Sequence, residues 1–217
     1  MIKNLLFALG GVIMDIRKER CVEAFEALGL KDASGYFGEF SQQGPFMALE
    51  RGDISVAEFH DALRPDLPAG TSDEAIDAAF CRFLIGIPAH RLRALEELKA
   101  KYNVYLLSNT NPIMWDSTIR TEFEKDGHDR EYYFDGMVTS FEANSLKPEE
   151  KIFRYTADTL GIDPAETLFF DDSQANLDAA AKLGFKTTLV APGTEFVDIL
   201  HNTVCLLYTS PSPRDRT

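Results

Sequence analysis

The chain has 217 residues, of which 45% are hydrophobic, so it is long enough for one domain or for a core with a modest insertion. Its formal net charge of −13, with no basic stripe, argues against a nucleic-acid partner and against binding to an anionic membrane. The N-terminus lacks a signal-peptide pattern, no apolar stretch is long enough to span a bilayer, and Cys21, Cys81 and Cys205 lack metal-ligand spacing, so we expect reduced thiols in a cytoplasmic protein.

Short apolar strands alternate with amphipathic helices along most of the chain, which is typical of an α/β fold with a central parallel sheet. The apolar runs predict strands at Leu5–Leu9, Val104–Leu107, Gly136–Thr139, Thr167–Phe170 and Thr187–Val190. The 3.6-residue spacing of apolar side chains predicts helices at His90–Lys101, Glu149–Leu160 and Gln174–Leu183.

The interval from Asp15 to Pro88 departs from this alternation, because it contains helical patterns and no convincing strand. Helices are expected at Val22–Leu28, Gly44–Glu50, Val56–Leu63 and Ser72–Leu84. Ser55 and Glu58 have the spacing of a capping box, which predicts a helix start there. We therefore expect a core formed by residues 1–14 and 88–204, with residues 15–87 as a small all-helical insertion after the first strand.

Small residues stand at the carboxyl ends of the first two predicted strands. The first strand runs through Ala8 into Gly10 and Gly11, and the second ends at Ser108 and Asn109. A hydroxyl at such a position, together with the N–H groups that follow it, can bind a phosphate oxygen. The alternative for Ser108 is an ordinary helix N-cap.

A lysine and two carboxylates follow later strands. Lys147 precedes Pro148 at the start of a predicted helix, where a fixed ammonium group would neutralise a phosphoryl group, although a lysine before proline is usually a surface residue. Asp171 and Asp172 end a buried strand, and two adjacent carboxylates there require a compensating cation unless one of them caps a helix. Mg²⁺ prefers a few carboxylates with water and a substrate phosphate.

Taken together, these segments resemble the haloacid dehalogenase (HAD) superfamily of phosphatases and dehalogenases. The resemblance implies a Rossmann-like core with a helical cap that closes over the strand ends. It also implies a nucleophilic aspartate at the position of Ala8, an acid/base residue at the position of Gly10, and substrate contacts from Ser108, Asn109 and Lys147. The Mg²⁺ ligands would be Asp171, Asp172 and the backbone carbonyl of Gly10. Two polar segments of the cap, residues 41–45 and 50–53, could reach the site, or they could be ordinary solvated turns.

The resemblance leaves three hypotheses. One is a Mg²⁺-dependent phosphatase of small phosphorylated metabolites, sugar phosphates first, inactive or strongly impaired as written because alanine offers no nucleophile. Another is a non-catalytic module that binds phosphate or a metabolite. The last is a 2-haloacid dehalogenase, which Asp171 and Asp172 disfavour because that chemistry is metal-free. Residue 8 could be a natural variant, an engineered change or a sequencing error.

The last residues of the chain resemble a translated sequencing adapter. Residues 205–215 match the translation of a transposase-type sequencing adapter, so we expect residues 205–217 not to be native to the protein. A natural tail rich in proline and serine is the alternative. We expect this segment to lack packed contacts.

Overall fold

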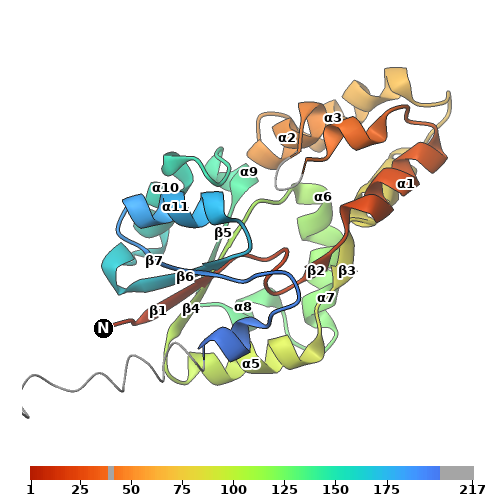
Figure 1. The fold of residues 1–217 in the computed structure, drawn as a ribbon. Coiled ribbons are helices and arrows are strands. Elements are labelled where there is room, and N and C mark those ends of the chain that lie inside the picture. Colours follow the sequence, from red (N-terminus) through yellow and green to blue (C-terminus); the bar gives the residue numbers. More distant parts are fainter. Residues whose placement is uncertain (39–41, 201–217) are drawn as a thin grey trace, which may run out of the picture.

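The computed structural model describes residues 1–38 and 42–200, so the predicted adapter segment 205–217 lies outside the described residues. A five-stranded parallel sheet has the strand order β5-β4-β1-β6-β7 (Figure 1). Its strands are β1 (Asn4–Phe7), β4 (Asn103–Ser108), β5 (Gly136–Thr139), β6 (Thr167–Asp171) and β7 (Lys186–Leu189). The predicted α/β fold, with the strand that leads into Ala8 at the centre of the sheet, is confirmed.

Helices cover both faces of the sheet, as Figure 1 shows. The side chains of β1 alternate between two buried clusters, with Leu5 and Phe7 in one and Leu6 in the other. The cluster of Leu6 includes residues of α10 (Glu150–Leu160) and α11 (Gln174–Lys182). The opposite cluster includes residues of α5 (Ala89–Lys99) and α8 (Arg130–Tyr133). A strand buried on both faces explains why its sequence is a continuous apolar run.

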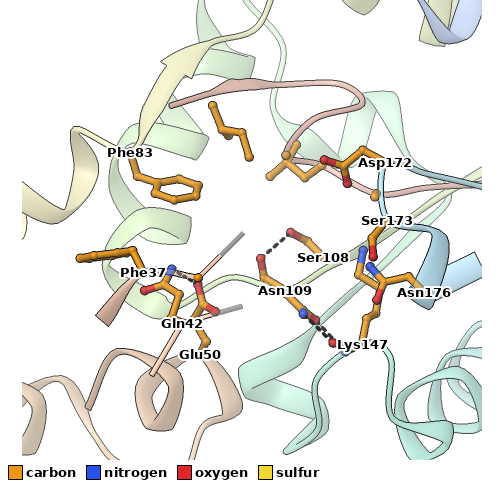
Figure 2. A pocket seen from close by; sticks show the side chains of 15 residues that line it. Phe37, Gln42, Glu50, Phe83, Ser108, Asn109, Lys147, Asp172, Ser173 and Asn176 are labelled. Atoms are coloured by element: carbon orange, nitrogen blue, oxygen red, sulfur yellow. Dashed lines mark hydrogen bonds between the residues drawn. The ribbon is translucent and has the colours of Figure 1, made fainter. Parts of the chain in front are cut away.

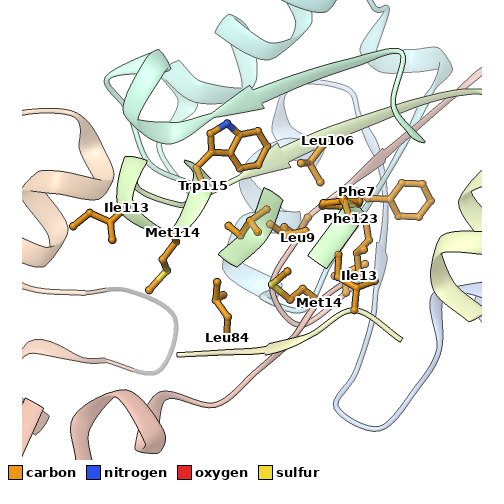
Figure 3. Close-up of a cluster of buried hydrophobic side chains, with 14 of the residues drawn as sticks. Phe7, Leu9, Ile13, Met14, Leu84, Leu106, Ile113, Met114, Trp115 and Phe123 are labelled. Atoms are coloured by element: carbon orange, nitrogen blue, oxygen red, sulfur yellow. The ribbon is translucent and has the colours of Figure 1, made fainter. Parts of the chain in front are cut away.

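The loop after β1 is fixed by hydrogen bonds and by packing. The backbone N–H groups of Ile13 and Met14 both donate to the carbonyl of Leu9, at 2.9 Å each. Leu9, Ile13 and Met14 pack among apolar residues of α6 (Pro112–Met114), η3 (Trp115–Ile119) and α7 (Arg120–Glu124) (Figure 3). This packing holds the Gly10–Gly11 turn at the carboxyl end of β1.

The inserted segment is mainly helical, as predicted. It contains α1 (Lys18–Leu28), η1 (Ala33–Tyr36), α2 (Gly44–Arg51), α3 (Val56–Leu63), η2 (Arg64–Asp66) and α4 (Asp73–Cys81). Its core is an aromatic cluster around Phe46, whose ring centroid lies 4.8 Å from that of Phe37 and 5.0 Å from that of Phe80. The predicted capping box is present, with the Glu58 N–H donating to Ser55 Oγ at 3.2 Å and the Ser55 N–H donating to Glu58 Oε2 at 2.7 Å.

The expectation of a strand-free interval was wrong at its two ends. Strands β2 (Asp15–Ile16) and β3 (Leu84–Gly86) pair antiparallel where the chain enters and leaves the insertion. They are too short for a period-two pattern, and each pairs with a partner far along the chain, so nothing local predicts them. The helix expected at Ser72–Leu84 ends at Cys81. The boundaries at residues 15 and 87 stay a prediction.

The remaining short elements are α9 (Ser140–Ala143), directly after β5, and η4 (Pro164–Glu166), directly before β6. Among the described residues, no helix is long and apolar enough to cross a membrane.

Candidate active site

Three neighbouring strands bring the predicted site residues to one edge of the sheet. Phe7 of β1 is level with Leu106 of β4 and with Phe170 of β6. The residues that follow these positions therefore leave the sheet at the same edge, where parallel α/β sheets bind their ligands. The N–H of Ala8 still donates to the Phe170 carbonyl at 2.9 Å, so residue 8 is fixed in the extension of the central strand.

A pocket lies at this edge, between the sheet and the inserted helices (Figure 2). Most of the predicted site residues line it: Ala8, Gly10, Ser108, Asn109, Lys147 and Asp172. Its other lining residues include Ser173 and Asn176 from the loop after β6 and the start of α11, and Phe37, Gln42, Glu50 and Phe83 from the inserted segment. The structure thus brings together residues from the ends of β1, β4 and β6, from the loop between α9 and α10, and from the insertion.

Lys147 and Asp171 form a buried ion pair beneath the pocket. Lys147 Nζ donates to Asp171 Oδ2 at 2.7 Å and to the Leu107 carbonyl at 3.2 Å. The other carboxylate oxygen of Asp171 accepts from the Ser173 N–H at 2.8 Å and from Asn176 Nδ2 at 2.9 Å. Asp171 is completely buried and is absent from the pocket lining. Both carboxylate oxygens of Asp171 accept hydrogen bonds from protein donors, so Asp171 orients the lysine. The sequence analysis had instead predicted Asp171 as a metal ligand.

Asp172, unlike Asp171, lines the pocket. Burial and the adjacent negative charge of Asp171 raise its pKa to about 6, although Lys147 opposes this shift. The turn after β1 lies directly against it, because a Cβ on Gly11 would be 2.1 Å from Asp172 Oδ2. Gly11 also has a φ of +75°, so both the backbone conformation and the space require glycine.

Asn109 fixes the backbone of Lys147. Its Oδ1 accepts from the Lys147 N–H at 2.9 Å, and its Nδ2 donates to the Lys147 carbonyl at 3.1 Å. This reciprocal pair ties the loop after β4 to the loop that carries the lysine. Asn109 lines the pocket, and Ser108 beside it is almost completely buried.

The inserted segment contributes two buried polar residues to the pocket. Gln42 Nε2 donates to Glu50 Oε1 at 2.6 Å, and each side chain is 7% exposed. Burial raises the pKa of Glu50 to about 8. Both residues belong to the segments that the sequence left undecided between site loops and solvated turns. Phe37 and Phe83 were not predicted, because an aromatic residue between helices of an apolar insertion has no local sign of lining a site.

The site is suited to Mg²⁺ without an all-protein cage. Within the described residues, no cluster of three or more His, Cys, Asp or Glu side chains could hold a metal, and no salt bridge involves Asp172. Mg²⁺ usually takes one or two carboxylates and completes its shell with water and substrate phosphate. A half-buried carboxylate with a raised pKa beside an exposed turn fits that description. Asp172 and the Gly10 carbonyl are the groups that would hold the ion.

Comparison with known proteins finds relatives that share most of the chain and its fold. The chain is 35% identical over 187 residues to D-ribitol-5-phosphate phosphatase of Bacteroides thetaiotaomicron, covering 86% of this chain and 91% of the relative. A HAD-family enzyme of the same organism, solved with magnesium and inorganic phosphate, is 39% identical and has a TM-score of 0.86, covering 92% of this chain and 99% of the other. An aspartate-to-alanine variant of that enzyme was solved with the same two ligands, with a TM-score of 0.88, 40% identity and the same coverage.

A more distant structure shares the fold alone. It is the L-2-haloacid dehalogenase of Xanthobacter autotrophicus, 19% identical with a TM-score of 0.63, covering 98% of this chain and 85% of the other. The family model of haloacid dehalogenase-like hydrolases matches residues 2–184, which include every element from β1 to α11. This chain therefore belongs to the haloacid dehalogenase-like hydrolases.

Proposed function

We propose that this chain has the scaffold of a Mg²⁺-dependent phosphatase of small phosphorylated metabolites, and that Ala8 leaves it with strongly impaired turnover. The observation that carries the proposal is the joint position of Lys147, Ser108 and Asp172 around residue 8 in one pocket. The 35% identity to a D-ribitol-5-phosphate phosphatase makes a pentitol 5-phosphate the first candidate substrate.

The chain's own residues account for phosphate binding. The ammonium group of Lys147, held by Asp171, faces the pocket beside the Ser108 hydroxyl, and together they supply positive charge and a hydrogen-bond donor for phosphate oxygens. Bound Mg²⁺ would neutralise further phosphate charge at Asp172 and the Gly10 carbonyl. Such compensation is needed because the chain has a formal net charge of −13.

Residue 8 decides whether this binding leads to catalysis. An aspartate here would attack phosphorus, so that a carboxylate–phosphorus bond forms while the ester P–O bond breaks and the leaving alkoxide takes a proton. The methyl group of Ala8 cannot attack. Gly10 has no side chain to donate the proton, so the proton must come from water or from another group in the pocket.

The experiment restores the nucleophile. We expect Ala8→Asp to release phosphate from D-ribitol 5-phosphate about a thousandfold or more faster than the parent, and only with Mg²⁺ present. Ala8→Asn is the matched control, because its carboxamide has the shape of a carboxylate without its nucleophilicity. Equal rates in the parent and in Ala8→Asp would contradict the role of residue 8.

A non-catalytic phosphate-binding module is the second candidate, and Ala8 itself favours it. The related enzyme from Bacteroides thetaiotaomicron was solved with magnesium and inorganic phosphate after an aspartate was exchanged for alanine, so in that protein one such loss is compatible with binding. If Ala8→Asp bound phosphate and remained inactive across a broad panel of sugar phosphates, this candidate would replace the phosphatase.

A further inference from the structure

Gln42 and Glu50 form a polar pair on the wall of the pocket that belongs to the inserted segment. Gln42 precedes α2, and Glu50 is the second-last residue of that helix. In Figure 2 both lie on the same side as Phe37, across the pocket from Asp172. The phosphate-binding groups proposed above therefore lie at one end of the pocket, and this pair lies at the other.

The pair has unused hydrogen-bonding capacity. Gln42 Nε2 donates to Glu50 Oε1 at 2.6 Å, which fixes the orientation of both side chains. Gln42 Oε1 is completely buried and has no hydrogen-bond partner among the described residues. An unsatisfied buried acceptor destabilises the folded chain, so a ligand hydroxyl that donates to it would restore the missing hydrogen bond.

Glu50 complements this acceptor with a donor. Its carboxyl group keeps its proton at neutral pH, because burial raises the pKa to about 8. Oε1 is occupied by Gln42, so the acid proton on Oε2 is available for donation. The protonated form also places no negative charge in a pocket that must hold a phosphate dianion.

The pair is fixed at a set distance from the phosphate end. Ser140 Oγ lies 2.6 Å from the Glu50 carbonyl and 3.0 Å from the Thr110 carbonyl, so it joins α2 to the loop that follows Ser108. Asn144 Nδ2 donates to the Gly52 carbonyl at 3.1 Å, which adds a second connection just after α2. The loop after β4 thus starts beside Ser108 at the phosphate end of the pocket and is linked to Glu50 at the other end.

We propose that Gln42 and Glu50 form a subsite that recognises hydroxyl groups on the carbon chain of a phosphorylated polyol, through one acceptor and one donor. This inference rests on the function proposed above and deepens it by naming the residues that select the substrate. The subsite would bind two ligand hydroxyl groups at the same time, one that donates to Gln42 and one that accepts from Glu50. Phe37 and Phe83 form the apolar part of this wall.

The test uses the chain as it stands, because Ala8 prevents turnover and allows equilibrium binding to be measured with a real substrate. Calorimetric titrations with Mg²⁺ would compare three ligands: inorganic phosphate, D-ribitol 5-phosphate and n-pentyl phosphate, which has five carbons and no hydroxyl group. We expect D-ribitol 5-phosphate to bind about tenfold or more tightly than n-pentyl phosphate, because each tenfold step corresponds to about 1.4 kcal/mol.

Variants locate the effect. Gln42→Ala and Glu50→Ala should each weaken D-ribitol 5-phosphate binding about tenfold and leave inorganic phosphate within about twofold. Glu50→Gln keeps an acceptor for Gln42 and a donor for the ligand, so it should bind like the parent even if Glu50→Ala folds poorly. Gln43→Ala is the matched control, since Gln43 adjoins Gln42 but is exposed and does not line the pocket.

The outcomes separate this subsite from the proposed function. If inorganic phosphate does not bind the parent with Mg²⁺, both proposals fall. If phosphate binds but the two five-carbon ligands bind equally, or the variants weaken all three ligands alike, only the hydroxyl subsite is overturned. A Glu50→Gln variant as weak as Glu50→Ala would also overturn it, because the neutral donor would then be irrelevant.

Discussion

Asp171 and Asp172 are adjacent in the sequence and differ in their surroundings. Asp171 is completely buried and pairs with Lys147 at 2.7 Å, whereas Asp172 lines the pocket without a salt bridge among the described residues. The difference follows from strand geometry. Side chains alternate along β6, so Asp171 lies on the same sheet face as Phe169, and Lys147 Nζ is 5.5 Å from the centre of that ring. Asp172 follows the last residue of β6 and turns toward Gly11.

Neutralising the two carboxylates should therefore change the stability of the protein to very different extents. We expect Asp171→Asn to lower the free energy of unfolding by about 3–5 kcal/mol, because it leaves the buried ammonium group of Lys147 without its counter-charge. Asp172→Asn should change stability by less than about 1 kcal/mol, since it removes the carboxylate that repels Asp171 and breaks no ion pair. Urea unfolding of the two variants and the parent measures this difference.

The second readout is the effect of Mg²⁺ on phosphate binding. In the parent, Mg²⁺ should strengthen the binding of inorganic phosphate, and in Asp172→Asn this effect should disappear while the protein stays folded. Equal losses of stability in both variants, or an undiminished Mg²⁺ effect in Asp172→Asn, would show that the two carboxylates are not divided in this way.

The convergence of the site residues could be predicted from the sequence, because the ends of adjacent parallel strands meet at one edge. The division between Asp171 and Asp172 could not, since it depends on which residue ends β6 and on the loop that brings Lys147 to it. The pairing of Gln42 with Glu50 could not be predicted either, because it depends on how the residue before α2 is placed against the end of that helix.

At the scale of elements, α2 is one of the parts of the insertion that contact the core. A Cβ on Gly52, just after this helix, would be 2.2 Å from the Phe141 carbonyl oxygen of α9 and 2.8 Å from Asn144 Nδ2. Arg51 adds an ion pair with Glu149 across the same contact. The end of α2 is thus packed backbone to backbone against α9, with glycine at the point of closest approach.

Gly52→Ala should separate this contact. Gly70→Ala is its matched control, because Gly70 has a φ of +88° against +79° for Gly52 but has nothing within 4 Å of its added Cβ. Both substitutions pay a cost of about 1 kcal/mol for a left-handed backbone conformation, and only Gly52→Ala adds the steric clash, which we expect to cost a further 1–3 kcal/mol or so. Urea unfolding gives both values.

The same pair of variants tests the distance between the two ends of the pocket. Gly52→Ala should weaken D-ribitol 5-phosphate more than inorganic phosphate, because it moves Glu50 relative to the phosphate end, while Gly70→Ala should affect neither ligand. Similar losses of unfolding free energy in the two variants would mean that the insertion can shift at this contact without a steric cost.

The helices of the insertion were predictable because each has its own apolar periodicity and, for α3, a capping box. Strands β2 and β3 were missed because a ladder of two or three residues has no period of its own, and its partners lie at opposite ends of the insertion. The order of the five-stranded sheet is likewise a long-range property, but the central position of β1 follows from its apolar run, which is buried on both faces of the sheet.

At the scale of the whole molecule, Glu50 links folding to pH. Its pKa rises from 4.5 to about 8 on folding, because the folded chain buries the carboxyl group. The folded state therefore holds a proton that the unfolded state has lost between these two values. The stability that comes from this proton is fully present below about pH 4.5 and is lost as the pH rises through about 8.

Glu50→Gln isolates this contribution, because glutamine has nearly the same shape and does not titrate. Asp172, whose pKa rises to about 6, is present in both proteins, so its effect cancels in the difference. Between pH 5 and 8 the unfolding free energy of the parent should fall relative to that of Glu50→Gln by up to about 1.4 kcal/mol per pH unit, and level off above pH 8. Urea unfolding of both proteins at half-unit intervals measures the gap. If the difference in unfolding free energy stays constant with pH, Glu50 is ionised in the folded chain. Glu50 could then not act as the neutral hydrogen-bond donor proposed for the pocket.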